Sequence, residues 1–153
     1  MKHLILGIDP GRDKIGWAFA SCKGELILSG IVPSMAREIF FETLGRSTEE
    51  WEKGFAVWTR ECRFSFSGVR LKYVALGDGT KSREIAAQLE RLQLKTVIVN
   101  ERGTTLAARK LYWRLHCPVW WQRFLPSSLW IPPRELDDLA AWEIVLRSLA
   151  PPL

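Results

Sequence analysis

The hydrophobic pattern of the chain begins with an apolar run at residues 4–8, which is typical of a strand buried on both faces of a sheet. Asp9 follows this run directly. Pro10 and Gly11 then end the strand, because proline donates no ladder hydrogen bond and glycine tolerates positive φ. Because an unpaired buried charge is costly, we expect Asp9 to meet a cation or a hydrogen-bond donor.

Two further apolar segments, 14–20 and 25–32, predict strands that follow the first as an antiparallel meander. The segment 34–45 fits either a short helix or a loop. A clearer helix begins at Ser47, which forms a predicted capping box with Glu50. Apolar residues then recur at helical spacing at Trp51, Phe55, Trp58 and Cys62. We interpret this stripe as core packing, with stacking on nucleic acid as the alternative.

The remaining pattern alternates strands with helices. The predicted strands and helices cover residues 72–76, 82–92, 95–100, 104–115 and 136–149. The order β-β-β-α-β-α-β-α predicts an α/β fold, in which a mixed sheet carries helices on its faces. We expect one domain over residues 1–153.

The segment 117–133 is rich in proline and tryptophan and lacks a clean period, so we predict a long surface loop. Trp120, Trp121 and Trp130, together with Arg123, suit two roles. They are the residue types that stack on bases and hold phosphates. They are equally enriched at protein interfaces, which would make this loop a homodimer contact.

Composition adds three constraints. Hydrophobic residues make up 47% of the chain and charged residues 25%, as in folded globular proteins. The net charge of +5 favours an anionic partner such as nucleic acid. Cys22, Cys62 and Cys117 lack metal-ligand spacing and are expected to be reduced thiols. No signal-peptide pattern or long apolar stretch is present, so we expect a cytoplasmic protein without membrane contact.

Acidic residues follow several predicted strands. Asp9, Asp78 and Glu101 come after strands, while Asp137 and Asp138 open the last helix. Side chains at the carboxyl ends of parallel strands gather at one edge of a sheet, and converging carboxylates are expected to hold Mg²⁺ or Mn²⁺. Two such ions activate water on a phosphodiester. Turn chemistry alone explains Asp78. Asp137 and Asp138 lie about 100° apart on a helix, so we expect only one of them to face the cluster.

Four stretches resemble a known family. GIDPGRDKIGWAFA resembles the opening of the YqgF/RuvX group of RNase H-like nucleases, and NERGTTLAA and LDDLAAWEIVL are similar to two later motifs of that group. GDGTKSRE resembles a segment of the same domain inside Tex transcription factors. The motifs occur in the order that the family has. No such support exists for 34–71 or 117–133.

The resemblance implies an RNase H-like, five-stranded mixed sheet in the order 3-2-1-4-5, with the first three strands antiparallel. It implies metal-dependent cleavage of RNA or branched DNA, as in pre-ribosomal RNA processing or Holliday-junction resolution. By match, Asp9, Glu101 and Asp137 would ligate two Mg²⁺ or Mn²⁺ ions, with Asp138 beside them in the catalytic set.

Five further residues are candidates for contacts with the substrate backbone: Lys14, Lys81, Arg102, Thr104 and Thr105. Simple helix capping is the alternative for the two threonines. Two other functions stay open. One is a non-catalytic nucleic-acid-binding or protein-interaction module, as in Tex. The other is a phosphate-binding fragment of an actin-like or sugar-kinase ATPase, for whose two domains this chain is too short.

Overall fold

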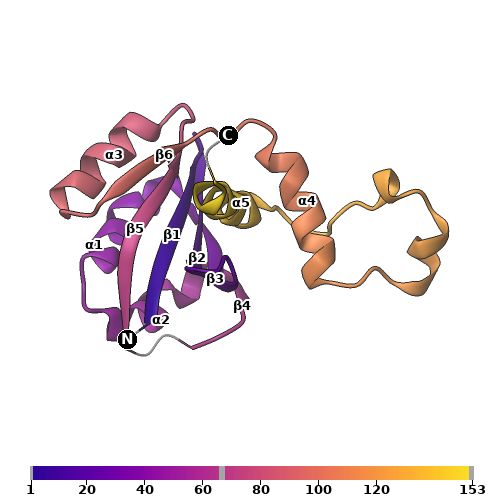
Figure 1. The fold of residues 1–153 in the computed structure, drawn as a ribbon, viewed down its shortest axis with the longest axis horizontal. Helices are drawn as coiled ribbons and strands as arrows, with labels where there is room; N and C mark the ends of the chain where they lie inside the picture. The colour runs from indigo at the N-terminus through magenta and orange to yellow at the C-terminus, as the bar shows by residue number, and fades with distance from the viewer. Residues whose placement is uncertain (1, 66–67, 152–153) are drawn as a thin grey trace.

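The computed structural model describes residues 2–65 and 68–151. A six-stranded mixed sheet in the order β4-β3-β2-β1-β5-β6 forms its centre (Figure 1). The strands are β1 (Lys2–Pro10), β2 (Lys14–Ser21), β3 (Leu26–Pro33), β4 (Thr59–Cys62), β5 (Val69–Gly77) and β6 (Thr96–Val99). β1 pairs antiparallel with β2 and parallel with β5, so the meander and the parallel half of the sheet meet at β1.

Five α-helices accompany the sheet. They are α1 (Arg37–Leu44), α2 (Thr48–Phe55), α3 (Ser82–Arg91), α4 (Thr104–Leu115) and α5 (Asp137–Leu149). Short 3₁₀ turns cover Ser34–Ala36, Ala56–Trp58, Trp120–Phe124 and Ser127–Leu129. None of the helices in the described part of the chain has the length and apolar character needed to cross a membrane.

The predicted α/β class and mixed sheet are confirmed, and the strand arrangement is compatible with an RNase H-like fold. The predicted extent of the helix after Ser47 was wrong. Cys62 does not continue the helix that begins after Ser47, because α2 ends at Phe55 and residues 59–62 form β4. β4 pairs with the otherwise open edge of β3, whose backbone groups need partners. The sheet therefore has six strands: the predicted order of five is kept, and β4 is added outside β3.

The predicted capping box at the start of α2 is also not formed. Ser47 precedes the helix, but its side chain has no capping hydrogen bond to the described residues. The segment 34–45, left open by its sequence, consists of a 3₁₀ turn followed by α1.

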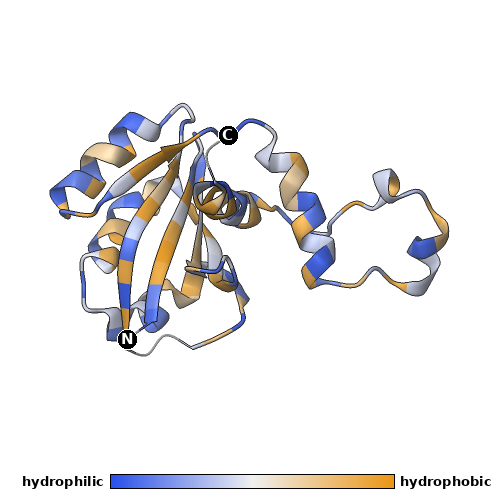
Figure 2. Cartoon of the chain, viewed as in Figure 1, coloured by the Kyte–Doolittle hydropathy of each residue, from blue (hydrophilic) through white to orange (hydrophobic). Residues whose placement is uncertain are grey.

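The two faces of the sheet differ in the size of their side chains. On the face covered by α1, α2 and α3, large rings pack together; the Trp17 and Phe55 ring centroids lie 5.2 Å apart. The other face is covered by α4 and α5. There, the strands β1, β2 and β5 carry small residues. These small residues are Gly7, Gly16, Ala18, Ala20 and Ala75. Figure 2 shows most of β1 as hydrophobic, in keeping with its burial between the two helix layers.

The small residues let the backbone of α5 lie directly on the sheet. A Cβ atom on Gly7 would lie 2.1 Å from the carbonyl oxygen of Ala141, and one on Gly16 would lie 1.9 Å from that of Asp137. No side chain fits at either distance. The first turn of α5 is therefore held against β2, and its middle against β1.

We predict that Gly7→Ala lowers the free energy of unfolding by about 2 kcal/mol or more, because the added methyl group pushes α5 off β1. Urea denaturation measures the change. Gly45→Ala is the matched control. The nearest atom to a Cβ at Gly45 would be the flexible end of Leu92, at 3.2 Å, the carbonyl oxygens of Glu42 and Phe41 would lie at ordinary contact distances of 3.5 and 3.6 Å, and the φ of −76° is ordinary. Equal destabilisation by the two substitutions would contradict this account of the α5 contact.

Candidate active site

Side-chain alternation along β1 places Asp9 on the face that carries α5, together with Ile5 and Gly7. Asp9 pairs across the strands with Gly16, the residue on which the first turn of α5 rests. Asp9 and Asp137 line one small hollow of about 80 Å³, with Thr105 at its edge. A hollow of this size has room for two or three water molecules. Two carboxylates far apart in sequence thus share a water-sized space.

Glu101 follows β6 and is held in place from several sides. Its backbone N–H donates to Asp78 Oδ1 at 3.1 Å. Its carboxylate lies against Gly77 and Gly79, since a Cβ on either glycine would come within 2.4 Å of a carboxylate oxygen. Arg147 of α5 donates to the carbonyl oxygens of the residues on both sides of Glu101, at 3.0 and 2.7 Å. Contacts from other parts of the chain therefore fix the position of the Glu101 side chain.

The site disfavours negative charge. Burial, together with the nearby carboxylates of Glu101 and Asp137, raises the pKa of Asp9 to about 7. Burial also raises the pKa of Glu101, with a smaller contribution from Asp78. Oε2 of Glu101 is buried and has no hydrogen-bond partner among the described residues. Carboxylate oxygens in this state are suited to bind a hard cation.

The third predicted ligand is partly neutralised. Lys14 Nζ lies 3.3 Å from Asp137 and 2.7 Å from Glu135. Over residues 2–65 and 68–151, no three His, Cys, Asp or Glu side chains are arranged to hold one metal ion together. Asp9 and Glu101 suit a hard cation because both offer carboxylate oxygens and because Oε2 of Glu101 has no hydrogen-bond partner among the described residues. The carboxylate of Asp137 is already engaged in an ion pair with Lys14.

Asp138 lies elsewhere. It is fully buried, accepts a hydrogen bond from Ser29 at 2.7 Å and pairs with Arg134 at 2.8 Å. Arg134 also contacts Glu61, which in turn contacts His116 at 2.6 Å. Only one residue of the acidic pair faces the hollow, as the helix geometry requires, and that residue is Asp137. Asp138 is part of an ion-pair network with Arg134 and lies outside the hollow that contains Asp9 and Asp137, so its catalytic role stays a prediction.

The predicted substrate contacts are placed as follows. Thr105 is exposed beside the hollow, whereas Thr104 is buried in the first turn of α4. Arg102 is exposed next to Glu101, and Lys81 pairs with Glu84 at 3.4 Å in the first turn of α3. Lys14 lies at the site. Thr105 and Arg102 are therefore the members of this set that remain available near the carboxylates, whereas Lys14 is held in ion pairs with Glu135 and Asp137.

Sequence reasoning missed two positioning residues. Asp78 was explained as turn chemistry, but it fixes the backbone of Glu101. The glycines on both sides of Asp78, directly after a strand, were a signal that something packs closely there. No local sequence pattern could predict the role of Arg147, because its hydrogen-bond partners beside Glu101 lie 45 and 47 residues away in the sequence.

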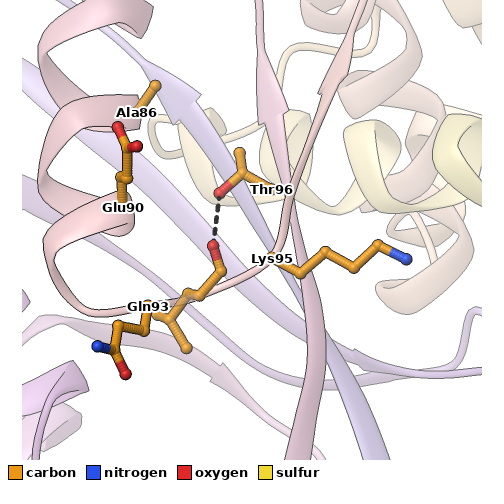
Figure 3. A pocket seen from close by; sticks show the side chains of 6 residues that line it. Ala86, Glu90, Gln93, Lys95 and Thr96 are labelled. Carbon is orange, nitrogen blue, oxygen red and sulfur yellow. Dashed lines mark hydrogen bonds between the residues drawn. The ribbon is translucent and has the colours of Figure 1, made fainter.

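A separate hollow of about 490 Å³ lies at the amino end of β6, between the end of α3 and Thr96 (Figure 3). Its lining includes one acidic side chain, Glu90, and one basic side chain, Lys95. Thr96 there donates to the carbonyl oxygen of Leu94 at 3.2 Å. This hollow is at the opposite end of β6 from Glu101 and has no cluster of chemically reactive groups.

Comparison with known proteins leaves the family open. No protein-family model matches the chain, and no curated protein matches it. Among solved structures, a ROK family transcriptional regulator, a homolog of the E. coli MLC protein, is similar with 14% identity and a TM-score of 0.43. The likeness covers 73% of this chain and 31% of the regulator. It is too distant to carry an argument about function.

We predict a pH-dependent effect of Asp9→Asn on the metal-free protein. Asp9 binds its proton more tightly when folded, because burial raises its pKa from 3.8 to about 7. The favourable contribution of Asp9 to the free energy of unfolding is therefore complete below pH 4 and is lost as the pH rises through 7. Asp9→Asn should raise the melting temperature by about 5 °C at pH 8 and change it little at pH 4.

Thermal unfolding in EDTA at both pH values measures this effect. Asp13→Asn, in the exposed turn after β1, is the control and should behave like the wild type at both. Equal melting temperatures for Asp9→Asn and the wild type at pH 8 would show that Asp9 is not held in an unfavourable charged state.

Proposed function

We propose that this protein is a metal-dependent nuclease that hydrolyses phosphodiester bonds in structured nucleic acid. The observation that carries the proposal is the pair formed by Asp9 and Glu101. Two carboxylates from the carboxyl ends of different strands share a site where both pKa values are raised. Such perturbed pairs are characteristic of functional sites.

The sequence motifs support the same function. The three stretches that resemble the YqgF/RuvX nuclease group contain Asp9, Glu101 and Asp137. Asp9 lies on β1, Glu101 follows β6, and Asp137 begins α5. The carboxylates of Glu101 and Asp137 both raise the pKa of Asp9. The motif match and the electrostatic coupling are independent observations that select one set of residues.

Asp9, Glu101 and Asp137 are the residues that would hold Mg²⁺ or Mn²⁺. The ion would supply positive charge for water activation and for the developing charge on the phosphate. The chain itself provides the rest: Asp78 and Arg147 position Glu101, and the contact of α5 with β2 positions Asp137. Arg102 and Thr105 are exposed nearby, where they can contact the nucleic-acid backbone.

A non-catalytic nucleic-acid-binding module is the second candidate, and one observation favours it. Lys14 already supplies Asp137 with a positive partner, so the acidic residues are partly balanced without an ion. In that case the carboxylates would be a charge network that supports the edge of the sheet, and nucleic acid would bind without being cleaved.

We predict that Asp9→Asn reduces cleavage by at least about 100-fold in Mg²⁺ or Mn²⁺, since it removes a charged ligand from the pair. Labelled branched DNA and structured RNA are the substrates, and gel electrophoresis of the products is the measurement. Asp13→Asn should cleave like the wild type. The catalytic proposal fails if the wild type cuts neither substrate, or if Asp9→Asn cuts as fast as the wild type.

We also predict that Lys14→Gln tightens Mn²⁺ binding by about fivefold, because the lysine competes with the ion for Asp137 across a partly exposed ion pair. Isothermal titration calorimetry measures the affinity. Lys23→Gln, the same change in the turn between β2 and β3, is the control and should leave the affinity unchanged. Absence of Mn²⁺ binding by all three proteins would favour the non-catalytic module.

A further inference from the structure

The segment 117–133, called the arm below, extends from the end of α4 away from the sheet (Figure 1). Its aromatic residues fall into two groups. Trp130 donates from its indole N–H to the carbonyl oxygen of Gln122 at 2.6 Å and packs edge-on against Trp113 of α4, so it holds the arm together. The other aromatic side chains remain outside: Trp120 is 75% exposed, Trp121 53% and Phe124 81%.

The arm is anchored at both ends. His116, just before it, and Arg134, just after it, both contact Oε1 of Glu61 on β4, at 2.6 and 2.8 Å. Arg134 also reaches the buried Asp138 at the start of α5. These contacts fix both ends of the arm against the edge of the sheet, so the exposed rings start from a defined position.

The arm and α4 carry an unbalanced positive charge. From residue 102 to residue 134 the chain has no Asp or Glu. The lysine and arginine residues of this stretch are Arg102, Arg109, Lys110, Arg114, Arg123 and Arg134. Arg134 is engaged in ion pairs, whereas Arg109, Lys110, Arg114 and Arg123 are exposed and form no ion pair with the described residues. Exposed basic side chains beside exposed aromatic rings are suited to bind nucleic acid, whose phosphates are negatively charged and whose bases can stack on the rings.

The surface leads from the carboxylates to the arm. Thr105 and Leu136 line the small hollow that contains Asp9 and Asp137. The same two residues line a second hollow of about 200 Å³, which also contains Arg109 and Ile131 of the arm. Asp9 and Asp137 on one side, and Arg109 and the end of the arm on the other, therefore line two neighbouring hollows that share Thr105 and Leu136.

We propose that α4 and the arm bind an unpaired stretch of nucleic acid. Trp120, Trp121 and Phe124 stack on its bases, and Arg109 holds its phosphates on the way to Asp9. The inference deepens the proposed nuclease function by assigning the substrate class: a nucleic acid with a single-stranded segment beside the bond that is cut. The bases of a duplex are already stacked on one another and are not free to stack on these aromatic rings.

A second copy of this chain fits the arm less well. An interface between two copies of the surface formed by α4 and the arm would bring together exposed cations without acidic residues, and the like charges would repel. Self-association is therefore kept as the outcome that would overturn the proposal.

The test is fluorescence anisotropy with a labelled 20-nucleotide oligo(dT) and a labelled hairpin duplex, using the full chain in EDTA so that no cleavage occurs. Trp120→Ala and Phe124→Ala should each weaken oligo(dT) binding by about tenfold and change duplex binding by less than twofold. Trp120→Phe should restore most of the lost affinity. Arg109→Ala should weaken binding to both probes and reduce the slope of log affinity against log salt by about 0.7 to 1.

Arg91→Ala, on the opposite face of the sheet at the end of α3, is the matched control and should leave both affinities and the slope unchanged. Retention of oligo(dT) affinity by both aromatic variants would overturn the proposal. So would sedimentation that shows a wild-type dimer dissociated by Trp120→Ala. Because binding is measured without a metal ion, a wild type that binds in this way but never cleaves would reject the nuclease function and keep the arm's role.

Discussion

The contact on which this structure depends is the direct approach of α5 to β1 and β2. Small residues at Gly7 and Gly16 remove the side chains that would normally separate a helix from a sheet, so the helix backbone rests on the strands. The opposite face of the sheet is filled by large aromatic rings and needs no such approach. As a result, the first turn of α5 is fixed beside the end of β1, and Asp137 shares a hollow with Asp9. A helix held off the strands by larger side chains would leave the two carboxylates farther apart.

Bringing carboxylates together has an electrostatic cost, and the protein has three ways to offset it. Asp9 can keep its proton, since burial raises its pKa to about 7. Lys14 balances Asp137 from β2. The divalent cation that we propose would be a third counter-charge, and it is the one that would let Asp9 and Glu101 ionise together. The nuclease and the binding-module hypotheses differ in which counter-charge prevails under working conditions. They agree on the residues involved.

The sequence predicted the layers of the fold better than it predicted the edge of the sheet. A continuous apolar run identified β1, and the helices predicted over residues 82–92, 104–115 and 136–149 match α3, α4 and α5 closely, because these elements are defined by local sequence. β4 was missed because an apolar stripe at helical spacing continues through Trp58 to Cys62 and hides the change to extended backbone at Thr59. The positions of Asp78, Arg147 and Asp138 depend on contacts between distant parts of the chain, which no local pattern contains.

The missed strand also explains how the arm comes to lie near the candidate site. Glu61 is buried on β4, a strand that forms only because β3 offers an open edge. Burial opposes ionisation of Glu61, but His116 and Arg134 outweigh it and hold its pKa below the usual range, so the carboxylate stays charged and binds both ends of the arm. Arg134 continues the network to Asp138, the neighbour of Asp137. Edge strand, arm and first turn of α5 are thus joined through one buried charge network. Adjacent acidic residues divide the work: Asp138 anchors the arm, while Asp137 faces the hollow to which the arm leads.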